Sequence, residues 1–126
     1  MSLTFRQAAP FRGPAYEYLR EEDDLPTFGE LADEPDPLCR VKLFLPGSRW
    51  TYSVCAATEY DGIDGPVLTG YCVSALDERF DDFGDQDLAS IAGVRLFGMP
   101  PERDLHFGPQ RLSTVKTSLT ERGFGP

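Results

Sequence analysis

Three short segments between residues 39 and 74 repeat their side-chain character every second residue, which is the period of a half-buried β-strand. These segments are residues 41–45, 50–57 and 67–73. Pro46-Gly47 separates the first two, because proline lacks an amide proton and glycine accepts a positive φ. Asp61-Gly62 and Asp64-Gly65 provide a second turn signal. Connections this short join antiparallel neighbours, so the sequence predicts a three-stranded antiparallel meander.

The meander should bury one apolar layer. We expect that layer to contain Val41, Leu43, Trp50, Tyr52 and Tyr71. Burying each large side chain stabilises the fold by roughly 1.5–3 kcal/mol. A glycine inside the third segment, Gly70, predicts a β-bulge or the close approach of another backbone.

The chain after the meander predicts further strands and short helices. Residues 79–83 fit a fourth strand at a sheet edge, and residues 102–107 fit a last strand or extended segment. A helix is expected over residues 86–92, with Asp85 as its N-cap and Gly93 just after its end. A final helix is expected from Thr114 to Arg122, with Ser113 as its cap and Gly123 at its end. The predicted class is α+β: a β-meander of four to five antiparallel strands with one or two short helices packed on it.

Residues 1–38 are predicted to form an irregular acidic arm, and residues 39–126 a single α+β domain. The arm carries five prolines and nine acidic residues against three arginines. Within it, residues 15–20 could form one or two helical turns, and residues 27–32 a short helix with Thr27 as N-cap. Its acids can be read as a solvated extension or as a surface that docks a partner.

The charge and the cysteines exclude several classes of protein. The net charge of −9 opposes direct binding of nucleic acid, because carboxylates and phosphates repel each other. No apolar run approaches the roughly 20 residues of a membrane helix, and the N-terminus has no long apolar stretch of a secretory signal, so we expect no membrane partner and a cytoplasmic protein. Cys39, Cys55 and Cys72 are distant in sequence and odd in number, which favours small buried residues over a disulfide framework. A metal site or a reactive thiol is the alternative; we expect no metal and no cofactor.

A second acidic stretch runs from residue 59 to residue 87, with nine acids and one arginine. It can be read as solvated turns, as an interaction surface that imitates a phosphate backbone, or as a carboxylate site for a divalent cation or acid–base chemistry. The loop lacks the ligand spacing of an EF-hand.

The most distinctive polar run is Glu102-Arg103-Asp104-Leu105-His106-Phe107, which contains the only histidine. His106 beside Asp104 could act as a base or a ligand, or both could belong to a structural hydrogen-bond network. Arg40, Lys42 and Arg49 provide a third, weaker option, a DNA accessory factor that binds through the first hairpin.

Several of these motifs together resemble a small bacterial family known only as a domain of unknown function, number 2958. The resemblance covers roughly residues 39–113 and rests on Val41-Lys42-Leu43-Phe44, Pro46, Ser48, Trp50-Thr51, Ala57-Thr58-Glu59-Tyr60-Asp61-Gly62, Gly70-Tyr71 and the run from Glu102 to Phe107. Members of that family tend to be encoded on plasmids and other mobile genetic elements, near anti-restriction and DNA-transfer genes. The resemblance implies a mobile-element setting, and with it an anti-defence or accessory role. It implies no catalytic residue.

The leading hypothesis is a non-enzymatic acidic protein of a mobile element that makes a protein–protein interaction. As a counter-defence inhibitor it would act as a DNA mimic and occupy a nucleic-acid-binding surface of a host or defence protein. The predicted partner-binding residues are Glu21, Glu22, Asp23, Asp24, Asp77, Glu78, Asp81, Asp82, Asp85 and Asp87. The alternative is a small ligand- or metal-binding domain or an enzyme. Its site would be formed by Glu59, Asp61, Arg103, Asp104 and His106. Whether the chain is an enzyme stays open, and the sequence favours a non-enzymatic role.

Overall fold

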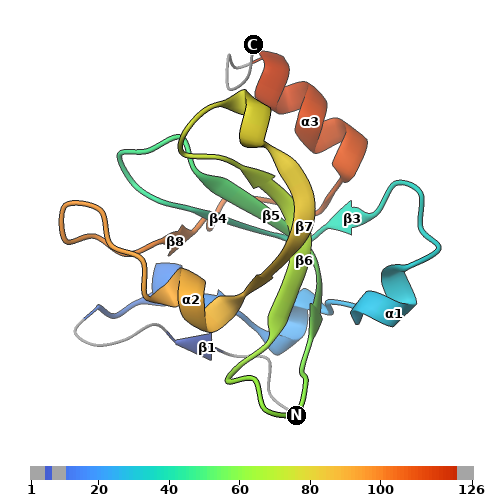
Figure 1. Cartoon of the computed structure of the whole chain (residues 1–126), viewed down its shortest axis with the longest axis horizontal. Coiled ribbons are helices and arrows are strands. Elements are labelled where there is room, and N and C mark those ends of the chain that lie inside the picture. The colour runs from blue at the N-terminus through green and yellow to red at the C-terminus, as the bar shows by residue number, and fades with distance from the viewer. Residues whose placement is uncertain (1–4, 7–10, 122–126) are drawn as a thin grey trace.

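The computed structural model describes residues 5–6 and 11–121, and its architecture is the predicted α+β class. A five-stranded antiparallel sheet with the order β7-β6-β5-β4-β8 forms the centre (Figure 1). Its strands are β4 (Val41–Phe44), β5 (Thr51–Thr58), β6 (Val67–Val73), β7 (Asp82–Asp87) and β8 (Glu102–Arg103). Among the described residues, no helix has the length and apolar character needed to cross a membrane.

The predicted meander is confirmed as β4, β5 and β6. Val41 of β4 pairs with Val54 of β5, and Thr51 at the start of β5 pairs with Val73 at the end of β6. Both predictions for Gly70 hold. The register of β5 against β6 shifts at the residue that faces it, and a Cβ at Gly70 would lie 2.1 Å from the carbonyl oxygen of Ser53.

Within the described residues, two small two-stranded sheets and six short helices surround the central sheet. β1 (Phe5–Arg6) pairs with β2 (Glu17–Leu19), and β3 (Leu38–Cys39) pairs with β9 (Gln110–Arg111). The helices are η1 (Pro14–Tyr16), η2 (Glu21–Asp23), α1 (Phe28–Leu31), η3 (Glu78–Phe80), α2 (Leu88–Ala92) and α3 (Leu112–Glu121). α1 begins as predicted: the Thr27 hydroxyl accepts from the Glu30 N–H, and the Glu30 carboxylate accepts from the Thr27 N–H at 2.9 Å.

The predicted caps of the two later helices are wrong. Asp87, not Asp85, caps α2, because the backbone of residues 82–87 is already engaged in β7; Gly93 follows the helix as predicted. α3 is capped from a distance by Asp36, whose carboxylate accepts from the N–H and the hydroxyl of Ser113. Ser113 therefore lies inside α3. The predicted helix end at Gly123 lies outside the described residues.

Three segment assignments also need correction. The predicted strand at residues 79–83 is divided between η3 and a strand that begins only at Asp82. Residues 14–19 form η1 followed by β2, not one or two full helical turns. In the run from Glu102 to Phe107, only the first two residues join the sheet, and the Phe107 N–H then closes a turn onto the Asp104 carbonyl.

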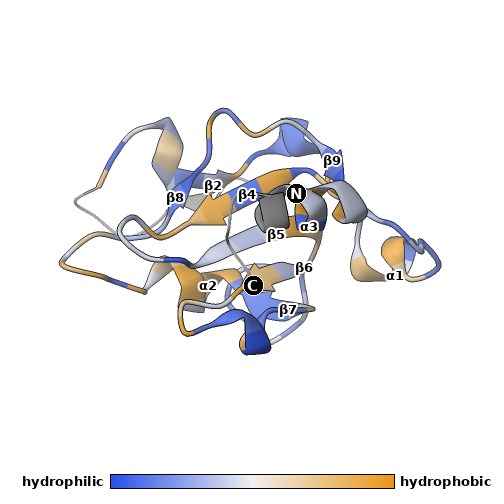
Figure 2. Cartoon of the chain, turned by 90° about the horizontal axis from the view of Figure 1, so that it is seen from above, coloured by the Kyte–Doolittle hydropathy of each residue, from blue (hydrophilic) through white to orange (hydrophobic). Residues whose placement is uncertain are grey.

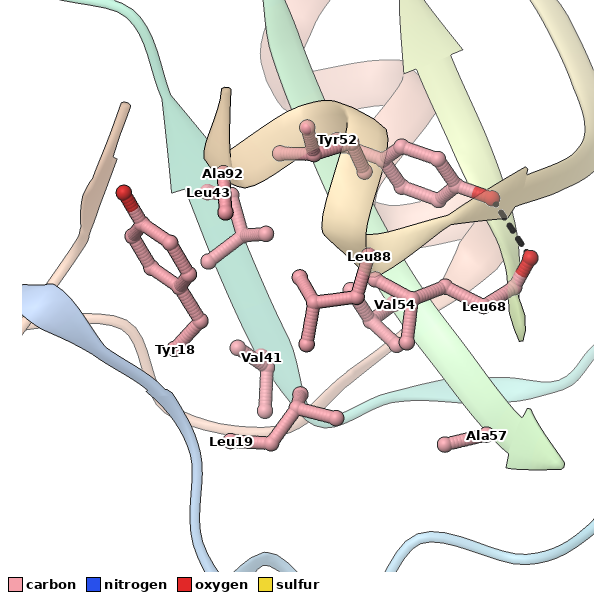
Figure 3. Packing of buried hydrophobic residues seen from close by; sticks show 11 residues of the cluster. Tyr18, Leu19, Val41, Leu43, Tyr52, Val54, Ala57, Leu68, Leu88 and Ala92 are labelled. Atoms are coloured by element: carbon pink, nitrogen blue, oxygen red, sulfur yellow. Dashed lines mark hydrogen bonds between the residues drawn. The ribbon is translucent and has the colours of Figure 1, made fainter. Parts of the chain in front are cut away.

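One face of the sheet carries the larger core, which we call the first core (Figure 3). Its buried members are Tyr18, Leu19, Val41, Leu43, Tyr52, Val54, Ala57, Leu68, Leu88, Ile91 and Ala92. The Tyr52 hydroxyl donates to the Leu68 carbonyl at 3.1 Å. Tyr18 and Leu19 do not fit the reading of residues 1–38 as a solvated extension: both are 0% exposed, and the Tyr18 hydroxyl donates to the Pro101 carbonyl at 2.7 Å. Burial raises the pKa of Tyr18 to about 12, so its phenol stays neutral.

The opposite face carries the smaller second core, formed by Cys39, Cys55, Val73 and Val115. Tyr71 packs here and not, as predicted, in the layer with Tyr52, because it pairs with Ser53, the next residue of β5. β5 is consequently buried on both faces. Figure 2 shows apolar residues concentrated in α2 and β4, whereas the stretch leading into β7 is strongly hydrophilic.

Candidate functional site

Two ion pairs hold acidic residues that the sequence assigned to partner binding. The Arg103 guanidinium of β8 donates to Asp23 of η2 at 2.7 Å and to the Tyr18 carbonyl at 3.0 Å. Only 12% of the Arg103 side chain and 5% of the Asp23 side chain are exposed. Asp23 therefore fastens η2 to the edge strand β8.

The second ion pair joins Arg49 and Asp81. Both carboxylate oxygens of Asp81 accept from the guanidinium at 2.8 Å, and one also accepts from the Ser74 N–H at 2.7 Å. The hydrogen bonds from Arg49 lower the pKa of Asp81 below its usual value. This bidentate pair fastens the turn between β6 and β7.

Other acids of the predicted set also make internal contacts. Asp85 accepts from the Thr69 hydroxyl at 2.7 Å, and Asp87 caps α2. Asp77 forms an exposed ion pair with Arg79 at 2.7 Å, and the hydrogen bonds from Arg79 lower the pKa of Asp77. The remaining five are exposed to solvent: Glu21, Glu22, Asp24, Glu78 and Asp82.

The exposed acids lie in two turns. We call residues 21–24 the η2 turn and residues 77–82 the η3 turn. The η2 turn is fastened to β8, and the η3 turn leads into β7, so the two lie at opposite edges of the sheet (Figure 1). Each contains exposed carboxylates next to one aspartate fixed by an arginine.

The alternative polar site is only partly assembled. The backbone N–H of His106 donates to the Asp104 carboxylate at 2.9 Å. Arg103 is held by Asp23, and Glu59 and Asp61 are exposed in the loop between β5 and β6. The structure thus brings Asp104 and His106 together, and no contact among the described residues joins them to the other three.

Asp104 and His106 line a cavity of about 200 Å³ on the face of the second core. Its other lining residues are Lys42, Ser53, Phe107, Gln110, Val115 and Ser118. Sequence reasoning missed Ser53, Gln110 and Ser118. The alternation of β4 and β5 placed Lys42 and Ser53 opposite the first core, but only the pairing of β9 with β3 brings Gln110 to this face.

The three basic residues of the first hairpin are separated. Arg49 is paired with Asp81, and Lys42 lines the cavity. Within the part of the chain that the structure describes, the buried Nε of Arg40 has no hydrogen-bond partner. These side chains do not form one basic strip.

The cysteines are arranged in a way that the sequence did not indicate. The Sγ atoms of Cys39 and Cys55 are 3.1 Å apart and buried, and the structure contains both as free thiols. No group of three or more His, Cys, Asp or Glu side chains within residues 11–121 is arranged to hold a metal ion.

Comparisons with known families, curated proteins and solved structures found no match for this chain. The resemblance to the mobile-element family therefore stays a prediction.

Proposed function

We propose that this chain is a non-enzymatic acidic protein that binds a basic protein surface and competes there with nucleic acid. The observation that supports it best is the construction of the η2 and η3 turns. In each, solvent-facing carboxylates sit beside an aspartate that an arginine holds in place. The held aspartate fixes the backbone of its turn, so the exposed carboxylates beside it start from a defined backbone position. Less conformational freedom is then lost on binding, which favours association with lysine and arginine side chains.

The mobile-element setting suggests which partner such a protein meets: a nucleic-acid-binding host or defence protein. Its basic surface would normally hold phosphates, and the two turns would replace them. The turns lie at opposite edges of the sheet. A single partner surface would therefore contact one of the two turns and not both. Binding of this kind weakens as salt rises, because dissolved ions screen exposed charges from each other. The screening length is about 10 Å at 0.1 M salt and becomes shorter at higher salt.

Affinity capture from nuclease-treated host lysate tests the proposal. The immobilised full chain should retain a nucleic-acid-binding protein at low salt and release it at high salt. That protein, once purified, should lose its nucleic acid in a gel shift when the chain is added. Retention that does not depend on salt would contradict the electrostatic mechanism.

Charge-reversal variants locate the surface. One carries Glu21→Lys and Glu22→Lys in the η2 turn, and a second carries Glu78→Lys and Asp82→Lys in the η3 turn. The control carries Glu59→Lys and Asp61→Lys, which change the net charge equally at exposed positions of another loop. At least one turn variant should bind the partner roughly tenfold more weakly than the control does. Equal losses in all three would show that net charge alone matters.

The cavity beside His106 supports a second candidate, the binding of a small polar ligand. Lys42 and His106 can face an anionic group, and Ser53, Gln110 and Asp104 can hydrogen-bond to hydroxyl or amine groups. Thermal shift with inorganic phosphate, nucleotides and divalent metal ions tests it, because a ligand that binds the folded state raises Tm. The shift should disappear in Lys42→Met and persist in the Glu59→Lys/Asp61→Lys control; an equal shift in both would place the ligand elsewhere.

A further inference from the structure

Two of the three cysteines lie side by side within the second core. Cys39 is in β3 and Cys55 is in β5, and both are 0% exposed. Their Sγ atoms are 3.1 Å apart, which is closer than the about 3.5–4 Å of an ordinary contact between carbon atoms. Cys72 is on β6 opposite Tyr52, so it belongs to the other face.

The backbone brings the two thiols together from independent directions. Cys55 is the unpaired residue of the bulge between β5 and β6, because Val54 pairs with Gly70 and Ala56 with Thr69. The Arg40 N–H donates to the Val54 carbonyl at 2.9 Å, and this bond holds the end of β3 against β5. The bulge belongs to the central sheet, and the end of β3 is hydrogen-bonded to it. The two thiols therefore already lie side by side in the reduced protein.

We propose that Cys39 and Cys55 form a reversible disulfide when a hydroperoxide oxidises them. Unlike the surface function proposed above, this inference depends only on the core. A bond length of about 2.0 Å requires the sulfurs to approach by about 1 Å. β3 and its partner β9 contain two residues each, and so short a pair opens locally without unfolding the sheet. Such opening admits the oxidant and allows the sulfurs to approach.

The reaction balances with hydrogen peroxide as oxidant. The Cys39 thiolate attacks one peroxide oxygen, the O–O bond breaks, and hydroxide leaves and takes up the thiol proton as water. The resulting Cys39 sulfenic acid is attacked by the Cys55 sulfur, and a second water leaves with the remaining proton. Two thiols lose two electrons, and one peroxide becomes two waters. The hydrogen bond between the two thiols lowers the pKa of Cys39, and the same contact, together with burial, raises the pKa of Cys55, so Cys39 is the attacking thiol.

The bond would join β3 to β5 and close the loop that contains the first hairpin. β3 pairs with β9, and α3 begins directly after β9 and contributes Val115 to the second core. Oxidation should therefore fix the C-terminal helix and the cavity wall that Gln110 and Val115 form. Closing a loop of this length stabilises the folded state mainly by restricting the unfolded chain.

Mass spectrometry of the full chain tests the proposal. The reduced protein is treated with excess hydrogen peroxide, denatured, alkylated and weighed. We expect a loss of two hydrogen atoms and a single alkylated thiol, Cys72. Oxidation should raise Tm by roughly 5–10 °C, and dithiothreitol should reverse both changes.

Trypsin places Cys55 and Cys72 in one peptide, residues 50–79, so the connectivity is read in a Cys72→Ala variant. After oxidation, that peptide should be linked to residues 21–40, which contain Cys39. Cys39→Ala should lose the bond. If Cys39→Ala does not fold, the peptides from the wild type and from Cys72→Ala still show whether the disulfide forms and which cysteines it joins. The proposal is overturned if all three thiols remain alkylatable, if the bond uses Cys72, or if oxygen atoms are added to a cysteine without cross-linking.

Discussion

The two faces of the central sheet are covered in different ways. The first core contains eleven buried residues, drawn from the meander, α2 and β2. The second contains four, and two of them are cysteines. The polar cavity also opens on this second face. The difference indicates that the first face supplies most of the stability, whereas the second face holds the groups able to react or to bind.

The largest effect should follow from a cavity in the first core. Leu43 is 0% exposed at the centre of β4. Leu43→Ala should lower the free energy of unfolding by about 3–4 kcal/mol, because the removed atoms lose their burial and leave a void. Urea denaturation measures this loss.

A matched pair of valines then separates the two faces. Val54 is 0% exposed in the first core and Val115 is 5% exposed in the second. We expect Val54→Ala to lower stability by about 2 kcal/mol and Val115→Ala by about 1 kcal/mol or less. Equal losses would mean that the two faces contribute equally to stability, which would contradict a larger contribution from the first face.

The ion pair of Arg103 and Asp23 keeps β2 on the first core. Asp23→Ala leaves a guanidinium that is 12% exposed and that, among the described residues, keeps the Tyr18 carbonyl as its acceptor. We expect a loss of about 3 kcal/mol, since removing one partner of a buried pair strands the other. The exposed pair of Asp77 and Arg79 is the control, and Asp77→Ala should leave the stability almost unchanged, because solvent screens this pair. Similar losses would show that β2 adds little to the core.

Crowding of the first core around the bulge is tested at two glycines that pair with each other. A Cβ at Gly70 would meet the Ser53 carbonyl at 2.1 Å and the Tyr52 ring at 2.6 Å, whereas a Cβ at Gly84 would meet nothing within 4 Å. Gly70→Ala should cost about 2–3 kcal/mol. Gly84→Ala should change stability by about 0.5 kcal/mol or less. Thermal melts of both variants check this; a tolerated Gly70→Ala would mean that the bulge relaxes freely.

The first face was largely predictable because its signals are local. Alternation over residues 41–57 places Val41, Leu43 and Tyr52 on one side, and the glycine at position 70 marks the bulge. Thr27 and Glu30 predict their helix start from a spacing of three residues. Each of these inferences needs only neighbours in sequence.

The second face was not predictable, because it depends on pairings between distant residues. Asp36 caps a helix that begins at Leu112, and Cys39 meets Cys55 only through a bulge. Tyr18 lies in an arm whose acidic and proline-rich sequence is typical of a solvated extension, whereas its carbonyl accepts from Arg103, an arginine 85 residues away. The candidate acids were identified by charge, but which of them are tied to arginines required the fold.

An effect that depends on pH should appear at the turn between β6 and β7. Asp81 has a depressed pKa in the folded protein because of the hydrogen bonds from Arg49, whereas an unfolded aspartate titrates near pH 4. The group therefore stabilises the fold fully above about pH 4, and this contribution disappears as the pH falls through the lower folded value. Asp81→Asn should cost about 1–2 kcal/mol at pH 7 and progressively less below pH 4. Asp82→Asn makes the same change of charge at an exposed neighbour and should have little effect at either pH. Urea denaturation of both variants at pH 7 and pH 3 decides: a cost for Asp81→Asn that is the same at both would mean that the ion pair with Arg49 does not hold this turn.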